Sequence, residues 1–226
     1  MSSASARRRS GPLPRLHVVT DDATVEAPGF LDRAARVLEE GGERLALHLR
    51  APSTTGACLY EWVGALAPSA RDAGAFLIVN DRVDVALAWE VDGAHLGARS
   101  LPAPAARAIL GPDVWLGASA HGVEEILALA AEEIDYLFLG HVFETPSHRD
   151  VVGLGVEGVR HAMRSAGEVP VVVIGGITAD RVEPMIGAGG YGVAVARGVW
   201  AARDPSDAVR GYLDALERGG GSRGGN

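Results

Sequence analysis

Ile134-Asp-Tyr-Leu-Phe-Leu-Gly-His-Val-Phe-Glu-Thr-Pro-Ser-His-Arg149 is an apolar run of strand length that turns abruptly polar after Gly140. A strand of a parallel sheet reads as a continuous apolar run, because both of its faces are covered. The polar residues then lie at the carboxyl end of the strand and in the loop that follows it. In α/β proteins this end is where ligands bind. The stretch therefore predicts an α/β fold with a functional site beside it.

The alternation of strand-like and helix-like segments extends through most of the chain. Strands are expected at residues 16–20, 45–50, 76–79, 93–96, 115–118, 136–140, 171–174 and 192–195. Helices are expected at residues 30–40, 82–89, 123–132, 156–165, 179–186 and 205–217. Eight strands with intervening helices in about two hundred residues fit a single (β/α)8 TIM barrel. An open doubly wound sheet is the alternative, but no Gly-x-Gly-x-x-Gly turn follows the first strand and polar residues follow nearly every strand.

The two ends of the chain differ from this pattern in composition. Residues 1–14 are basic and Ser-rich and residues 218–226 are Gly-rich, so we expect disordered tails around a barrel of residues 15–217. The net charge of −8 argues against nucleic-acid binding, and no apolar run reaches the length of a membrane span. The single cysteine, Cys58, allows no intramolecular disulfide, which favours a cytoplasmic protein. A homodimer is compatible with such a barrel.

Polar residues follow most of the predicted strands and would form a ring around one mouth of the barrel. In chain order the ring comprises Thr20, Asp21, Asp22, His48, Arg50, Asn80, Asp81, Arg82, His95, Ser119, His121, His141, Glu144, Thr145, Gly175, Gly176, Ala196, Arg197 and Gly198. It contains imidazoles, cations and glycine loops but few carboxylates. The seven histidines are scattered, and none has the spacing of a zinc site.

The last two strand ends indicate phosphate binding. Gly175 and Gly176 end the seventh strand and precede a helix, and Ala196 and Arg197 end the eighth. Backbone N–H groups in a glycine turn and at a helix start are preset to receive an anion. In barrels these two loops are the usual phosphate site. The other interpretation is that the glycines only allow strand and helix to pack closely.

Three other strand ends carry residues with two interpretations each. His121 follows the fifth strand and can exchange a proton near neutral pH, or it caps the next helix. Arg50 suits a phosphate or carboxylate ligand, or a salt bridge to a loop acid. The pair Asn80-Asp81 can orient a ligand or hold a metal ion, or it can cap a helix. We expect Asp81 to be the cap and Asn80 to point into the mouth.

Seven motifs in order make the chain resemble the thiamine-phosphate synthase / TenI family of (β/α)8 barrels over roughly residues 16–216. They are Leu16-His-Val-Val-Thr-Asp21, Asn80-Asp-Arg-Val-Asp-Val-Ala-Leu87, Asp92-Gly-Ala-His-Leu-Gly97, Gly117-Ala-Ser-Ala-His121, Asp135-Tyr through Gly140-His-Val-Phe-Glu-Thr145, Ile174-Gly-Gly-Ile177 and Gly192-Val-Ala-Val195. The resemblance implies thiamine biosynthesis and a small thiazole phosphate as ligand.

The family's synthase joins a pyrimidine diphosphate to a thiazole phosphate with Mg²⁺ and several cations, and this chain departs from its pattern. The resemblance places Gln-x-Arg-x-Lys at His48-Leu-Arg50-Ala-Pro52, so only the arginine remains. The Mg²⁺-binding aspartate after strand four corresponds to Ser100, and a lysine after strand six to His148. These losses should cripple Mg²⁺ binding and pyrophosphate release, because Asp81 alone is a poor metal site.

The family's other activity is the TenI thiazole tautomerase, which needs no metal. The resemblance to it lies in Gly140-His-Val-Phe-Glu-Thr145 and in a histidine at position 121. It implies that His121 moves the proton, with no cofactor. His48, Arg50, Asn80, Ser119, His141 and Thr145 would bind substrate, and Gly175, Gly176, Ala196 and Arg197 would bind phosphate. The tautomerase has a lysine pair where this chain has His148-Arg149, and the family serine after strand eight is Arg197 here.

Our interpretation is therefore a cytoplasmic, metal-independent isomerase of the tautomerase type. The enzymatic alternative is a divergent thiamine-phosphate synthase, for which Mg²⁺ would be the cofactor and Asp81 a ligand. A third is a barrel that binds a phosphate ligand without turnover, and a fourth is a related isomerisation outside thiamine metabolism.

Overall fold

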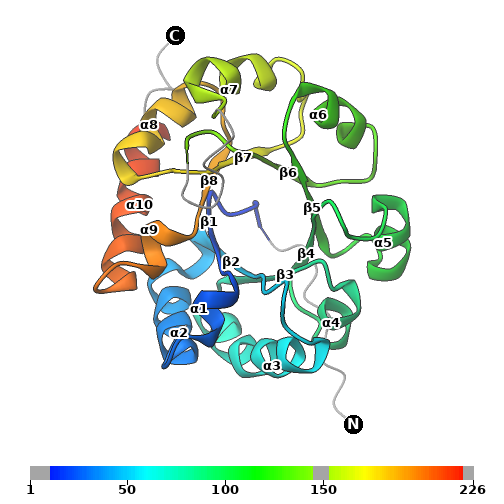
Figure 1. Cartoon of the computed structure of the whole chain (residues 1–226), viewed down its shortest axis with the longest axis vertical. Coiled ribbons are helices and arrows are strands. Elements are labelled where there is room, and N and C mark those ends of the chain that lie inside the picture. The colour runs from blue at the N-terminus through cyan, green and yellow to red at the C-terminus, as the bar shows by residue number, and fades with distance from the viewer. Residues whose placement is uncertain (1–10, 145–152, 221–226) are drawn as a thin grey trace.

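A computed structural model of the chain describes residues 11–144 and 153–220. Its parallel strands pair in sequence order and close into a barrel, so the predicted TIM barrel is confirmed (Figure 1). The strands are β1 (Leu16–Val19), β2 (Leu45–Leu49), β3 (Phe76–Asn80), β4 (Gly93–Leu96), β5 (Trp115–Ala120), β6 (Tyr136–Leu139), β7 (Val171–Ile174) and β8 (Gly192–Val195). All eight lie where the apolar runs predicted them, with small shifts at their ends.

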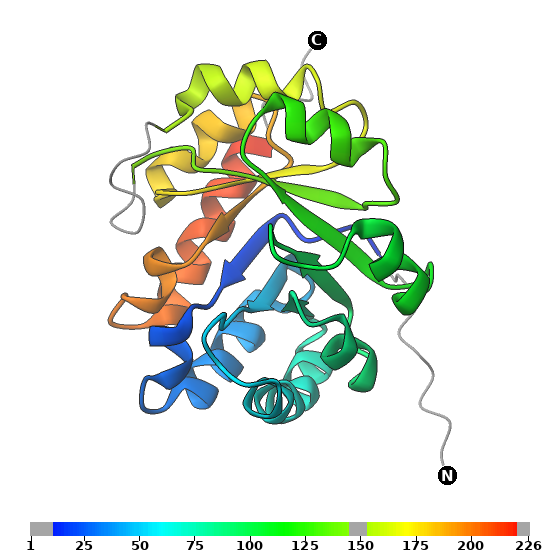
Figure 2. The ribbon, with the colours of Figure 1, turned by 45° about the vertical axis from the view of Figure 1, so that its right-hand side comes forward.

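Helices surround the barrel as an outer ring, which Figures 1 and 2 show from two sides. They are α1 (Asp22–Glu26), α2 (Phe30–Gly41), α3 (Gly56–Ala73), α4 (Val83–Ala88), α5 (Ala103–Leu110), α6 (Val123–Ala130), α7 (Gly155–Met163), α8 (Ala179–Gly187), α9 (Arg197–Trp200) and α10 (Pro205–Gly220), with the short 3-10 turn η1 (Gly42–Arg44). Helix α3 had no predicted range, because Gly64 and Pro68 interrupt its pattern as helix breakers do. No helix of the described ranges is long and apolar enough to cross a membrane.

Two apolar layers hold the barrel, one on each face of the sheet. Side chains alternate between the faces of a strand, so β1 turns Leu16 and Val18 outward against the helices and His17 and Val19 into the lumen. The lumen is filled mainly by aliphatic and aromatic side chains, among them Phe76, Tyr136 and Phe138. It also holds buried polar side chains at its centre, namely His17, His48 and His95.

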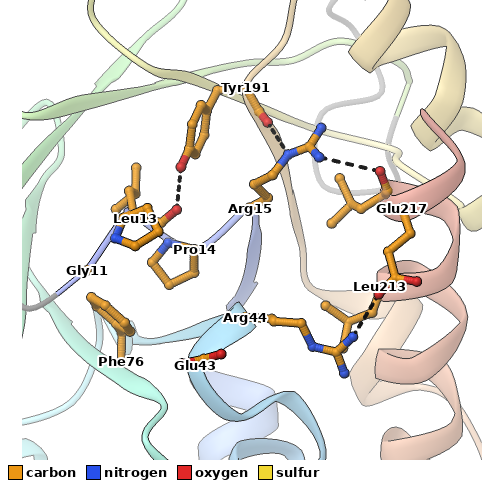
Figure 3. A pocket seen from close by; sticks show the side chains of 12 residues that line it. Gly11, Leu13, Pro14, Arg15, Glu43, Arg44, Phe76, Tyr191, Leu213 and Glu217 are labelled. Atoms are coloured by element: carbon orange, nitrogen blue, oxygen red, sulfur yellow. Dashed lines mark hydrogen bonds and ion pairs between the residues drawn. The ribbon is translucent and has the colours of Figure 1, made fainter. Parts of the chain in front are cut away.

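The chain ends are more ordered than the composition predicted. Residues 11–14, expected in the basic tail, pack against the amino end of the barrel, where Leu13 is buried and accepts a hydrogen bond from the Tyr191 hydroxyl (Figure 3). Helix α10 continues to Gly220, although the sequence predicted a disordered tail from Arg218. Arg218 pairs with Glu183 of α8 at 2.8 Å. At residues 11–14 and 218–220 the expectation of disorder does not hold, because tertiary contacts override local composition. Residues 1–10 and 221–226 lie outside the described ranges.

A cavity of about 410 Å³ opens at this amino end, between Leu13, Phe76, Tyr191, Leu213 and Leu216. Figure 3 shows that the side chains around it come from the chain start, β3, the β8 approach and α10. None of the polar residues predicted for the functional site lines it. Ligand-binding residues of barrels lie at the opposite, carboxyl end of the strands.

Candidate active site

A cavity of about 580 Å³ opens at the carboxyl end of the strands, where the sequence predicted a ring of polar residues. Residues from β1, β2 and β5–β8 or their following loops line it. Among the predicted site residues it is lined by Arg50, Ser119, His121, His141, Gly175, Gly176, Ala196 and Arg197. The fold therefore brings together residues that are up to about 150 positions apart in the sequence, because the loops after all eight parallel strands open at the same end of a barrel.

His121 lines this cavity and is held by Glu125 of α6. The backbone N–H of His121 donates to Glu125 Oε2 at 2.9 Å, and the ring atom Nδ1 lies 3.0 Å from the same oxygen. A carboxylate only accepts, so Nδ1 carries the proton of the neutral ring and Nε2 is left as the acceptor. The hydrogen bonds from His121 lower the pKa of Glu125, which keeps this carboxylate ionised. The pair has the arrangement of a base and the group that orients it.

The alternative interpretation of His121 as a helix cap does not hold. The N-cap of α6 is Gly122, and no side chain caps it. Glu125 instead reaches back to His121, so the helix positions the histidine. The ring of His141 lies nearby, with the two ring centroids 6.2 Å apart. Two imidazoles therefore share this side of the cavity.

The glycine turn after β7 forms another wall of the cavity. Gly175 and Gly176 have φ values of +104° and +65°, a region that favours glycine. A Cβ on Gly176 would lie 2.8 Å from the Cβ of Phe143 and 2.9 Å from the carbonyl oxygen of Glu144. The turn is thus closely packed and also lines the cavity. Close packing and phosphate binding, the two interpretations from the sequence, therefore do not exclude each other.

Arg181 is a cavity residue that the sequence analysis missed. Its Nη1 donates to the Gly176 carbonyl oxygen at 2.7 Å, and its guanidinium lies 4.3 Å from the centroid of the Phe143 ring. It stands about one turn into α8, close to the helix start that follows the glycine turn. Arg197, which begins α9, also lines the cavity, so both loops predicted to bind phosphate are followed by a cation in its lining. A cation one turn after a glycine turn would have been the signal to look for.

Arg50 follows β2 and also lines the cavity. Its backbone is fixed by Thr20, whose hydroxyl donates to the Arg50 carbonyl at 2.9 Å and accepts from the Arg50 N–H at 2.9 Å. The side chain is close enough to His95 that its positive charge contributes to lowering that pKa. Within residues 11–144 and 153–220 no carboxylate pairs with Arg50, so the salt-bridge interpretation finds no partner there.

His48 and Asn80, both predicted to bind substrate, do not line the main cavity. His48 is fully buried in the lumen and does not line the cavity. Its Nε2 lies 2.8 Å from His17 Nδ1, and its Nδ1 lies 3.2 Å from Asn80 Oδ1. Burial lowers the pKa of His48 well below its ordinary value and that of His17 to about 3. His48 can therefore act on a ligand only through Asn80, which borders a separate cavity of about 150 Å³.

Ser119 links the cavity to a second buried imidazole. His95 Nε2 lies 2.9 Å from Ser119 Oγ, and His95 Nδ1 lies 3.3 Å from the Tyr136 hydroxyl. Burial lowers the pKa of His95 to about 3 and raises that of Tyr136 above its ordinary value. Both groups therefore stay neutral near pH 7. The hydrogen bond between His95 and Ser119 holds the hydroxyl of this cavity-lining residue in place.

Asp81 is not the helix cap that the sequence predicted. The N-cap of α4 is Arg82, without a side-chain cap, and Asp81 has φ +64°. Its carboxylate accepts from the Gly97 N–H at 3.1 Å and from the Ser100 hydroxyl. The β4–α5 loop supplies backbone and hydroxyl donors to this carboxylate, which leaves Asp81 unavailable to the helix start.

The same contacts bear on the Mg²⁺ that the family resemblance implies. Mg²⁺ in proteins is held by carboxylate and phosphate oxygens. Asp81 is the one carboxylate among the described residues that line the 150 Å³ cavity, and Arg82 and Arg99 line it too. Over the described ranges, no group of three or more His, Cys, Asp or Glu side chains could hold a metal ion. This donor set does not fit a protein-held Mg²⁺. Thr145, also predicted to bind substrate, lies outside the described residues.

Comparisons with known proteins agree with this architecture. The family model described as thiamine monophosphate synthase (TMP-TENI) matches residues 16–199. The thiamine-phosphate synthase of Chlorobium luteolum is 39% identical over 88% of this chain and 92% of its own length. That of Moorella thermoacetica is 42% identical over 78% and 84%. A Pyrococcus furiosus structure described as thiamine phosphate pyrophosphorylase has a TM-score of 0.79 at 32% identity, over 91% of this chain and 96% of that one.

These relatives are all named as synthases. The comparisons therefore favour the synthase alternative of the sequence analysis over its main interpretation, the tautomerase. The broader prediction, that the chain belongs to the family of thiamine-phosphate synthase and TenI, is confirmed. The match spans most of the chain, at identities that indicate common descent, and includes the strand ends that form the cavity. The chain belongs to the thiamine monophosphate synthase (TMP-TENI) family, whose named relatives are enzymes of thiamine biosynthesis.

Proposed function

We propose that the chain is a metal-independent isomerase that aromatises a thiazole carboxylate phosphate tautomer by proton transfer through His121. The observation that carries the proposal is the His121–Glu125 pair in a cavity that is also lined by three arginines and a glycine turn. A phosphate would bind to the N–H groups of the turn near Arg181 and Arg197. The substrate carboxylate would face Arg50.

The chemistry needs one group that accepts a proton from one ring position and returns it to another. Nε2 of His121 is the acceptor, because Glu125 accepts from Nδ1. Loss of the ring proton and its return leave the substrate an isomer of itself, and the gain of aromaticity makes the step downhill. The carboxylate of Glu125 stabilises the imidazolium between the two transfers. A positioned base of this kind contributes about 10²–10⁴-fold.

Charge around the cavity suits an anionic substrate without a metal. Arg50, Arg181 and Arg197 line it, against the carboxylates of Asp21 and Glu144. Asp21 is already engaged as the N-cap of α1, where it accepts from the Thr24 N–H at 2.8 Å. The remaining positive charge can bind a phosphate and a carboxylate together.

A synthase is the second candidate, and the identity to named synthases favours it. The absence of lysine at the synthase positions is not informative by itself, because the chain has no lysine at all. Its 21 Lys+Arg residues are all arginine. A general replacement of lysine by arginine would have left arginines at these positions. They are Pro52 and His148 instead, so the loss of charge there is specific. Together with the Asp81 environment, this favours the isomerase.

The deciding experiment supplies the purified full-length protein with the thiazole tautomer and follows formation of the aromatic ring by absorbance, with and without EDTA. We expect turnover that EDTA leaves unchanged and that His121→Asn lowers by about 10²-fold or more. His161→Asn, which changes an exposed histidine of α7, is the matched control. Full activity of His121→Asn would contradict the assigned role.

A parallel reaction tests the second candidate. The protein receives the pyrimidine diphosphate, the thiazole phosphate and Mg²⁺, and released pyrophosphate is measured. Mg²⁺-dependent release at an enzymatic rate, without tautomer turnover, would establish the synthase instead. Binding of the thiazole phosphate with neither reaction would identify a barrel that binds without catalysis.

A further inference from the structure

A chain of hydrogen bonds crosses the barrel lumen from its amino end to Asn80. It begins at the Pro14 carbonyl oxygen, 2.9 Å from His17 Nε2. It continues from His17 Nδ1 to His48 Nε2 at 2.8 Å and from His48 Nδ1 to the Asn80 side chain at 3.2 Å. Both rings are fully buried. Each of these three contacts joins two nitrogen or oxygen atoms and needs one hydrogen between them.

Counting protons along this chain determines its direction. A neutral imidazole carries one N–H, so two neutral rings supply two hydrogens for three contacts. Pro14 offers only a carbonyl, which cannot donate, so His17 must donate from Nε2 and accept at Nδ1. His48 must then donate from Nε2 and accept at Nδ1. The third hydrogen must come from Asn80.

Asn80 can supply that hydrogen only through its NH2 group. In the structure Oδ1 is the atom 3.2 Å from His48 Nδ1. The two ends of a side-chain amide are nearly equal in size, and half a turn about the Cβ–Cγ bond exchanges them. With Oδ1 in this place, two acceptors would face each other unless one ring took up an extra proton. Burial opposes that, since it lowers the pKa of both rings.

We propose that His17 and His48 are positioning residues that hold the Asn80 amide with its NH2 group towards His48 and its carbonyl oxygen towards the adjoining cavity. Asn80 then offers an acceptor on the wall of the 150 Å³ cavity, next to Asp81. The matching ligand group is a hydrogen-bond donor, such as an amino group or a hydroxyl, and not a phosphate oxygen. The third lumen histidine, His95, has no such direction, because Ser119 and Tyr136 can each donate or accept.

The inference rests on the proposed function only in taking this mouth of the barrel as the ligand site. Its test does not depend on any activity. The full-length protein is labelled with ¹⁵N-histidine, and a two-bond ¹H–¹⁵N correlation spectrum at pH 7 reports the tautomer of each ring. His17→Phe assigns one set of signals. We expect both His17 and His48 as neutral Nε2–H tautomers, and an Nδ1–H or cationic His48 in the unmodified protein would overturn the proposal.

Asn80→Asp provides a second readout, because a carboxylate of the same shape can only accept. We expect His48 to change from the neutral Nε2–H form to one that carries hydrogen on Nδ1. Tyr136→Phe removes a buried hydroxyl that bonds to His95 and to none of the groups between Pro14 and Asn80. It should therefore leave the His17 and His48 tautomers unchanged. An Asn80→Asp protein whose His48 keeps the Nε2–H form would contradict the assigned direction. If that variant does not fold, the spectrum of the unmodified protein still decides.

Discussion

His121 and Glu125 show how two hydrogen bonds to one carboxylate can fix the orientation of a side chain. The imidazole is more than half exposed and would be free to turn without its partner. Glu125 accepts from both the backbone N–H and Nδ1, so it fixes the backbone, the ring orientation and the tautomer together. Two contacts to one carboxylate thereby orient a surface histidine in the way that the proposed role as a base requires.

Replacement of that carboxylate should lower activity more than stability. In Glu125→Gln the amide can still accept from Nδ1, but it no longer stabilises the imidazolium. We expect kcat for the proposed isomerisation to fall by about tenfold with little change in KM. Glu124→Gln, one position away in the first turn of α6, is the matched control and should keep the original rate. Equal losses in both variants would show that only the general charge of the helix start matters.

At the scale of the element, the turn between β7 and α8 combines an unusual backbone conformation with close packing. Gly176 has a positive φ and almost touches the loop that follows β6. The turn thus couples this wall of the cavity to the loop that carries His141. A side chain at this position affects both.

Gly176→Ala should destabilise the protein by about 1–3 kcal/mol, because the left-handed conformation is strained for alanine and its Cβ meets Phe143. KM for the phosphorylated substrate should rise as the turn shifts. Urea unfolding and steady-state kinetics measure the two effects. Gly187→Ala is the control: it ends α8, a Cβ there meets nothing within 4 Å, and alanine favours a helix. A Gly176→Ala protein as stable as this control would refute the packing argument.

The segment of residues 11–14 is an element that the composition concealed. Leu13 is 4% exposed at the amino end of the barrel, and its carbonyl accepts from Tyr191. We expect Leu13→Ala to cost about 2–4 kcal/mol, as truncation of a buried leucine does. Leu127→Ala removes the same atoms from a leucine of α6 that is 54% exposed and should change stability by less than about 1 kcal/mol. Similar urea midpoints for the two variants would mean that this segment does not contribute to the folded core.

For the whole molecule, the neutral lumen histidines link folding to pH. The folded-state pKa values of His17 and His95 are about 3, against 6.5 in an unfolded chain. Below pH 6.5 the unfolded state therefore binds protons that the folded state refuses. Stability is fully present above about pH 6.5 and is lost progressively as the pH falls towards about 3. Each such histidine contributes a slope of about 1 kcal/mol per pH unit in that window.

Removal of one lumen histidine should therefore flatten this dependence. In His95→Gln we expect the unfolding free energy between about pH 6 and 4 to fall less steeply, by about 1 kcal/mol per pH unit, even if the variant is less stable at neutral pH. Urea unfolding at several pH values measures the slope. His161→Gln alters an exposed histidine and should keep the original slope. An unchanged slope in His95→Gln would mean that His95 is not held neutral by burial.

Much of the fold and part of the site could be predicted from local sequence. Each strand is a short apolar run, and the residue that follows it is placed at the mouth by the parallel topology. Arg50, His121, Gly175 and Arg197 could thus be assigned to one cavity before any contact was known. Helix α3 could not be assigned, because its interior glycine and proline resemble breakers and only packing keeps it helical.

Other site features depend on how the backbone turns after each strand, which the residue types alone do not show. Arg181 reaches the cavity because α8 turns it back over the glycine loop. Glu125, in the first turn of α6, reaches back to His121, and the sequence analysis assigned it no role. Asp81 was predicted to cap a helix, but donors from the next loop take it away. In each case the partner lies on a loop or turn whose path is set by tertiary packing.

The sequence by itself determined the barrel, the mouth that carries the site and the types of residue at its edge, because strand length and chain alternation are local properties of a parallel (β/α)8 fold. Only the tertiary structure decided which of these residues act together. The sequence predicted that His48 binds substrate, yet the residue is buried in the lumen, where its partners are His17 and Asn80. Hydrogen-bond direction and burial depend on neighbours from distant strands, so they exist only once the barrel has closed.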